Sequence, residues 1–171
     1  YLFHYAVGFT VITRPTQGQP MFSRILLRVL QPWFRLHRGM TLGVRILVLD
    51  GENRVFLVRH GYAPGWLLPG GGVERGQTLY DAVERELAEE GGIVPGERPV
   101  LHGVFSNEAK FRGDHVACFV LRNFTRKEWT PTLEIKEARF FPVTALPEGA
   151  TGGPRRRIAE VLEGRIPPTN W

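Results

Sequence analysis

The sequence predicts an α/β domain over residues 41–171, with strands and helices sharing one core. Two observations lead to this fold class. Several apolar runs bounded by turn residues indicate strands, and two longer segments with apolar residues every three or four positions indicate helices. A chain of 171 residues has the size of one domain, and burial of about 70% of its unfolded surface provides a core without disulfide bonds.

The predicted strands are short runs rich in Val, Ile, Leu and Phe. Residues 41–50 and 54–61 flank the turn "DGEN" and predict a hairpin. "WLLP" reads as a shorter strand that leads into a glycine-rich loop. Three further strands are predicted at 99–107, 114–124 and 137–143.

Residues 78–92 predict a helix with clear start and stop signals. Thr78 and Asp81 have the spacing of a capping box, and Gly91-Gly92 supply a C-terminal stop. A second helix is predicted at 154–164. The buried stripe of the first helix is formed by residues that recur every four positions, Leu79, Val83 and Leu87.

Basic charge is concentrated at the start of the chain. Residues 1–49 contain six arginines and no acidic residue, whereas the remainder has 16 basic and 17 acidic residues. Residues 1–20 read as a tail and 21–40 as a basic amphipathic helical segment. That segment is interpreted as packing on the domain or on a second subunit; the alternative is peripheral contact with anionic lipid through 21–39. A homodimer that forms through this segment is therefore one of the alternatives. The sequence shows no nucleic-acid-binding module.

The single cysteine, Cys118, excludes an intrachain disulfide and fits a cytoplasmic protein. It lies in an apolar run and is interpreted as a core residue. Arg155, Arg156 and Arg157 form a second small basic cluster near the C-terminus.

Three glutamates of the first helix can share one face. Glu86, Glu89 and Glu90 are three and four positions apart, and like charges at that spacing destabilise a helix by roughly 0.2–0.5 kcal/mol per pair. A solvated acidic helix end is one interpretation. The other is that a cation lies between the carboxylates.

The glycine-rich loop before this helix limits the kinds of phosphate-binding site that the sequence can form. "GGGVERG" leads into a helix N-terminus, which is a common place for phosphate. It lacks the GK[ST] of a Walker A loop and the G-x-G-x-x-G of a dinucleotide site.

Loop and helix together resemble the Nudix box, G-x5-E-x7-R-E-U-x-E-E-x-G-U with U aliphatic. The stretch "GGVERGQTLYDAVERELAEEGGI" covers 71–93, and Gln77 stands where the family has its first glutamate. The resemblance implies an α/β/α sandwich with a mixed β-sheet between helices. The box positions that match are Gly71, Arg85, Glu86, Leu87, Glu89, Glu90, Gly92 and Ile93.

The resemblance also implies a function. We expect divalent-metal-dependent hydrolysis of a nucleoside diphosphate linked to another moiety, with Mg²⁺ as cofactor and Mn²⁺ as a substitute. Nucleotide sugars, ADP-ribose-like compounds and modified nucleotides remain open as substrates. The alternative is a Nudix-fold module that binds nucleotides or regulates without hydrolysis.

Site residues follow by position in the box. The resemblance makes Glu86, Glu89 and Glu90 the catalytic, metal-binding carboxylates, with the carbonyl of Gly70 as a further ligand. The resemblance makes Arg85, Gln77 and Gly71 structural; Gln77 can still accept a hydrogen bond from Arg85 but loses the ion pair of the family's glutamate. Glu134 is the candidate base or extra ligand, and its alternative is an exposed glutamate at a strand end.

Candidate substrate-binding residues lie outside the box. Arg59 and Arg112 could reach phosphates, and Trp66 could stack on a base; each has a structural alternative, a solvated arginine or a core tryptophan. Three other polar residues could line the substrate pocket: His60, Asn107 and His115.

Overall fold

The structure is a computed structural model that describes residues 39–150 and 152–171. Within these residues Met40–Trp171 forms one compact unit. The predicted tail at 1–20 and nearly all of the basic segment at 21–40 lie outside the described residues. In the part of the chain that is described, no helix is long and apolar enough to cross a membrane.

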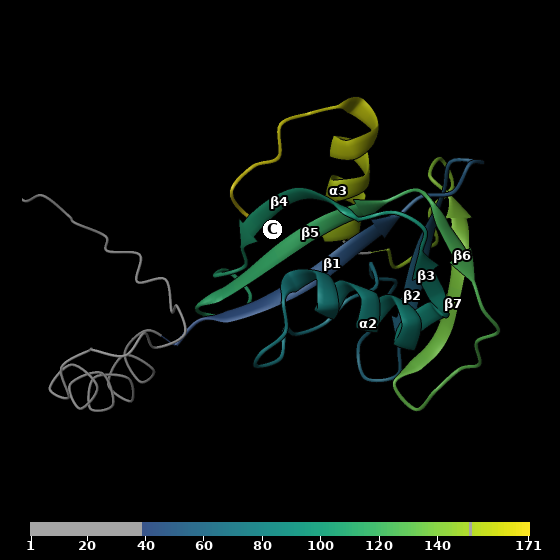
Figure 1. The fold of residues 1–171 in the computed structure, drawn as a ribbon. Helices are drawn as coiled ribbons and strands as arrows, with labels where there is room; N and C mark the ends of the chain where they lie inside the picture. Colours follow the sequence, from purple (N-terminus) through teal and green to yellow (C-terminus); the bar gives the residue numbers. More distant parts are fainter. Residues whose placement is uncertain (1–38, 151) are drawn as a thin grey trace, which may run out of the picture. The chain divides into compact units, whose positions relative to one another are not determined.

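The central layer is a mixed sheet of three strands (Figure 1). β1 (Thr41–Val48) runs parallel to β5 (Asp114–Leu121), and β5 pairs antiparallel with β4 (Val100–Ser106). Two antiparallel pairs complete the strands: β2 (Arg54–His60) with β7 (Ile135–Pro142), and β3 (Ile93–Pro95) with β6 (Phe124–Arg126).

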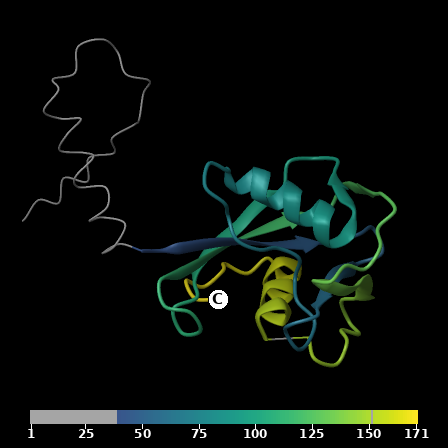
Figure 2. The ribbon, with the colours of Figure 1, turned by 90° about the horizontal axis from the view of Figure 1, so that it is seen from below.

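One helix covers each face of the central sheet. α2 (Leu79–Gly91) and α3 (Gly152–Glu163) lie on opposite sides of β1 and β5 (Figure 2). Alternate residues of β1 point to the two layers, as the pleat requires. Val44, Ile46 and Val48 pack in the cluster that contains Val83 and Leu87 of α2. Leu47 packs in the cluster that contains Ile158 of α3. The predicted α/β/α sandwich is confirmed.

The predicted hairpin is wrong in its pairing, although both strands exist. β1 pairs with β5 and β2 pairs with β7, and between β1 and β2 there is one bridge beside the turn, Leu49 with Val55. Both strands carry long runs of fully buried residues instead of alternating exposure. Such runs are typical of interior strands that are covered on two faces.

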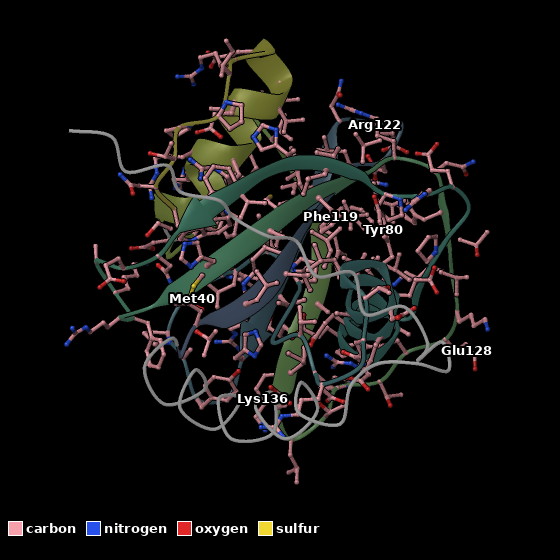
Figure 3. The ribbon with its side chains drawn as sticks, turned by 60° about the vertical axis from the view of Figure 1, so that its left-hand side comes forward. Met40, Tyr80, Phe119, Arg122, Glu128 and Lys136 are labelled. Atoms are coloured by element: carbon pink, nitrogen blue, oxygen red, sulfur yellow. The ribbon has the colours of Figure 1, made fainter. Side chains whose placement is uncertain are left out.

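The start and stop of α2 are as predicted. Thr78 caps the helix, and its backbone N–H and hydroxyl form a reciprocal pair of hydrogen bonds with Asp81. Gly92 ends the helix in the left-handed region, at φ 64°. The first turn is anchored to the sheet by Tyr80, whose ring lies 5.3 Å from that of Phe119 on β5 (Figure 3).

The three consecutive arginines at the start of α3 do not form one basic cluster. Arg155 and Arg156 are exposed, but Arg157 is 0% exposed. Its guanidinium lies 2.6 Å from a carboxylate oxygen of Glu160 and 3.9 Å from the ring centre of Phe105. Arg157 is therefore a core residue that joins α3 to β4.

Candidate active site

The box glutamates divide into two buried side chains and one exposed side chain. Glu86 and Glu90 lie on the inner face of α2, with 7% and 4% exposure. Glu89 points outward, with 61% of its side chain exposed. The backbone N–H of Gly70 donates to Oε2 of Glu90 at 2.7 Å, so the glycine loop closes over the helix at this residue.

The loop approaches its neighbours so closely that side chains are excluded. Gly70 has φ 136°, and a Cβ there would lie 2.1 Å from the carbonyl oxygen of Val44. A Cβ on Gly71 would lie 2.4 Å from a carboxylate oxygen of Glu86. Glycine at 70 therefore lets the loop pass close to β1, and glycine at 71 leaves room for the carboxylate of Glu86.

Burial dominates the electrostatics of these carboxylates. It raises the pKa of Glu90 to about 8, against the hydrogen bond from Gly70 and the charge of Arg45. It also raises the pKa of Glu86, against the ion pair with Arg85. Two buried carboxyl groups whose charged forms are disfavoured make a site that gains from a bound cation.

Arg85 does not pair with Gln77. The Gln77 side-chain oxygen accepts from the backbone N–H of Glu74 at 3.0 Å. Arg85 instead donates to the Gly72 carbonyl at 2.9 Å and lies 2.8 Å from Glu86 and 3.1 Å from Glu89. The predicted Arg85–Gln77 hydrogen bond is wrong, because an amide without charge competes poorly with two carboxylates for a guanidinium.

Arg45 on β1 is a second cation at the site, and it was missed at the level of sequence. Its guanidinium donates to the carbonyl of Gly70, the predicted metal ligand, and to that of Leu68 at 3.3 Å. A charged residue inside the apolar run "TLGVRILV" was the available signal, because even a half-buried charge in a strand needs a partner.

A cavity of about 620 Å³ opens onto the buried carboxylates. His60 at the end of β2 and Glu134 just before β7 form part of its wall. Tyr62, which was not predicted, donates its hydroxyl to Glu134 at 3.2 Å. The full acidic wall of this cavity, called the carboxylate cavity below, consists of Glu86, Glu89, Glu90 and Glu134.

A second cavity, of about 380 Å³, lies on the other side of the glycine loop. It shares Arg45, Gly71 and Gly72 with the carboxylate cavity. Asn107 and Lys110, from the loop between β4 and β5, line it together with Asp114. We call it the loop cavity. Asn107 lines this cavity, and its contact with a substrate stays a prediction.

The predicted substrate-binding residues lie elsewhere. Arg59 pairs with Glu137 on the exposed face of β2 and β7. Trp66 is 6% exposed and packs edge-on against Phe141 at 4.7 Å, so it serves the core. Arg112 is exposed in the β4–β5 loop. None of these three lines the carboxylate cavity or the loop cavity.

The donor set suits a divalent cation. Glu86, Glu90 and the Gly70 carbonyl are oxygen donors of the kind that Mg²⁺ and Mn²⁺ prefer. Within residues 39–150 and 152–171 no three acidic or histidine side chains already surround one point, and Arg85 and Arg45 hold two of the donors. The buried carboxylates and the close glycine cradle nevertheless fit a bound ion.

Comparison with known proteins agrees with this fold. Residues 39–161 match the sequence model of the NUDIX domain. An ADP-ribose pyrophosphatase of Methanocaldococcus jannaschii is 32% identical over 105 residues, which are 59% of this chain and 62% of that protein. An RNA pyrophosphohydrolase of Francisella tularensis is 38% identical over 63 residues, 37% of this chain and 41% of that protein.

A solved MutT NUDIX hydrolase from Burkholderia pseudomallei shares the fold. Its TM-score is 0.61 at 24% identity, over 71% of this chain and 97% of that one. The chain therefore belongs to the NUDIX domain family, and the predicted family is confirmed. The match spans less than two thirds of the length of the two curated relatives described above.

Proposed function

We propose that this chain is a pyrophosphohydrolase that cleaves the diphosphate linkage of a nucleoside diphosphate derivative with a divalent metal ion. The observation that carries the proposal is the pair of buried carboxylates, Glu86 and Glu90, beside a glycine loop that leaves no room for a side chain at Gly70 or Gly71. The relatives named as pyrophosphatases support the same reaction class.

The reaction breaks one P–O bond of the diphosphate. Water attacks one phosphorus, and a phosphate monoester leaves with the bridging oxygen. A bound divalent ion supplies charge neutralisation and an acidified water. Glu86, Glu90 and the Gly70 carbonyl would hold that ion. Glu134, an exposed residue in the wall of the carboxylate cavity, would accept the proton of the attacking water.

The two cavities suggest where the different parts of a substrate would bind. The diphosphate would lie at the glycine loop, which both cavities share. The organic part would lie in the loop cavity, where Asn107 and Asp114 offer polar atoms and Lys110 offers a charge for a distal phosphate or acid. This division fits nucleotide sugars, ADP-ribose-like compounds and modified nucleotides.

Turnover of a substrate panel tests the proposal. The full chain is incubated with Mg²⁺ or Mn²⁺ and with nucleotide sugars, ADP-ribose, dinucleotides and nucleoside triphosphates, and products are separated by chromatography. We expect turnover of one class, and a loss of more than about 100-fold in kcat for Glu90→Gln. Glu137→Gln, on the surface pair with Arg59, is the matched control and should keep its activity.

A second candidate function rests on Arg85. Because this guanidinium contacts Glu86 and Glu89, the negative charge of these carboxylates is balanced by a residue of the protein itself, in place of a metal ion. A nucleotide-binding module without hydrolysis would have this arrangement. Calorimetric binding of a panel compound with no product after prolonged incubation with either metal would establish this alternative and overturn the hydrolase.

A further inference from the structure

His60 is a buried histidine whose ring has no hydrogen-bond partner within residues 39–150 and 152–171. It ends β2, its side chain is 3% exposed, and it faces the carboxylate cavity. Among the described residues neither ring nitrogen has a hydrogen-bond partner. Each unsatisfied buried polar atom costs about 1–3 kcal/mol, so an imidazole kept in this position calls for a ligand.

The separation of His60 from Glu90 matches that of two ligands of one ion. Nε2 of His60 lies 3.5 Å from Oε1 of Glu90. With bonds of about 2.1 Å, two ligands of one metal ion are about 3.0 Å apart at a right angle and about 3.4 Å apart at a tetrahedral angle. The other oxygen of Glu90 is occupied by the N–H of Gly70, which leaves Oε1 facing the imidazole.

The second nitrogen of the ring faces a carboxylate. Nδ1 of His60 lies 4.0 Å from Oε1 of Glu134, and the Tyr62 hydroxyl donates to that same oxygen at 3.2 Å. Metal-binding histidines almost always donate their free N–H to a carboxylate or a carbonyl. At 4.0 Å this contact is longer than a hydrogen bond, so Glu134 would have to move closer to Nδ1 on metal binding in order to fix the tautomer that presents Nε2 to an ion.

We propose that His60 is a nitrogen ligand of the divalent ion, beside Glu90, with Glu134 as the residue that orients its ring. The inference rests on the metal dependence proposed above and makes it more specific. Imidazole favours ions such as Co²⁺ and Zn²⁺, whereas an all-oxygen site favours Mg²⁺. His60 therefore shifts the metal preference of this site away from Mg²⁺.

Pulsed electron paramagnetic resonance tests the ligand directly. Mn²⁺ is added to the metal-free full chain, and the spin-echo modulation from ¹⁴N is recorded. We expect the modulation of a directly bound imidazole in the unaltered protein and its loss in His60→Asn. His115→Asn is the matched control, because His115 also has a buried ring nitrogen without a partner but lies outside the carboxylate cavity. It should keep the modulation.

Calorimetry provides an independent reading. His60→Asn should weaken Co²⁺ binding by about 10- to 100-fold or more and Mg²⁺ binding by much less. Glu134→Gln should weaken Co²⁺ binding and keep the nitrogen modulation. His60→Gln replaces His60→Asn if the latter does not fold, as judged from its thermal unfolding without metal.

The outcomes separate this inference from the proposed function. Bound Mn²⁺ without nitrogen modulation, or modulation that persists in the folded His60 variant, overturns the histidine ligand and leaves the hydrolase standing. Equal loss of Co²⁺ and Mg²⁺ affinity also overturns it. If no divalent ion binds to the protein, the proposed metal dependence is wrong, and the proposed histidine ligand is wrong with it.

Discussion

The guanidinium of Arg85 lies against Glu86, with Nη1 2.8 Å from Oε1. This contact involves one of the two carboxylates that the site would use to hold a cation. In the Nudix box the arginine is expected to pair with a glutamate that this chain replaces by Gln77. Gln77 instead closes the turn at Glu74, so the positive charge of Arg85 is directed to α2 itself.

Gln77→Glu should therefore strengthen metal binding. A carboxylate at position 77 would compete for Arg85 and leave Glu86 for the ion. We expect Mn²⁺ affinity to rise roughly fivefold to tenfold, about 1.0–1.4 kcal/mol, measured by titration calorimetry. The same substitution in an Arg85→Gln background should add little, because the pair that it acts through is gone. An equal gain in both backgrounds would indicate a general charge effect instead.

Arg45→Met should also raise the affinity for a divalent ion in the absence of substrate. The methionine keeps the length of the side chain but frees the carbonyl of Gly70, to which Arg45 donates. We expect a gain of several-fold in Mn²⁺ binding by calorimetry. Arg59→Met removes the same charge from the exposed pair with Glu137. A gain of similar size in that control would contradict a role for the contact with Gly70.

Arg157→Met should destabilise the fold more than any other single arginine replacement in α3. It leaves Glu160, 6% exposed, without its guanidinium partner, and breaking a buried ion pair costs about 3–5 kcal/mol. Urea unfolding measures the loss. Arg156→Met, on the exposed side of the same helix, should cost less than about 1 kcal/mol. Similar losses in the two variants would show that burial of Arg157 contributes nothing.

Cys118 should be inert in the folded protein. It is 0% exposed on β5, and burial raises the pKa of its thiol to about 12. At pH 8 almost no thiolate is present to react. A colourimetric disulfide reagent should therefore label no thiol in the native protein and one per chain in guanidinium chloride. Rapid labelling of the native chain would place Cys118 at the surface.

Local signals in the sequence were reliable guides to local structure. The helix start at Thr78 and its stop at Gly92 involve contacts within one turn, so a short stretch of sequence contains both partners. Helical spacing also brought Glu86 and Glu90 to one face, as predicted, but it grouped Glu89 with them, and the structure turns Glu89 outward. The cation site itself stays a prediction.

Contacts between distant segments could not be predicted in this way. The apolar runs of β1 and β2 predict that these strands are buried, but they do not predict that β1 pairs with β5 and β2 with β7. Arg157 looks like its two neighbours in sequence, and its burial depends on Phe105 from another element. His60 is a candidate metal ligand because it lies near Glu90 and Glu134, which are 30 and 74 positions further along the chain.

The glycine loop has a consequence for how this protein can change during evolution. It borders two cavities: the carboxylate cavity, lined by α2 and the end of β2, and the loop cavity, whose wall includes Asn107 and Lys110 of the β4–β5 loop. If the organic part of the substrate lies in the loop cavity, as proposed, mutations at Asn107 or Lys110 would alter what is recognised without changing a carboxylate. Selection could then exchange one substrate for another while the carboxylates are inherited intact.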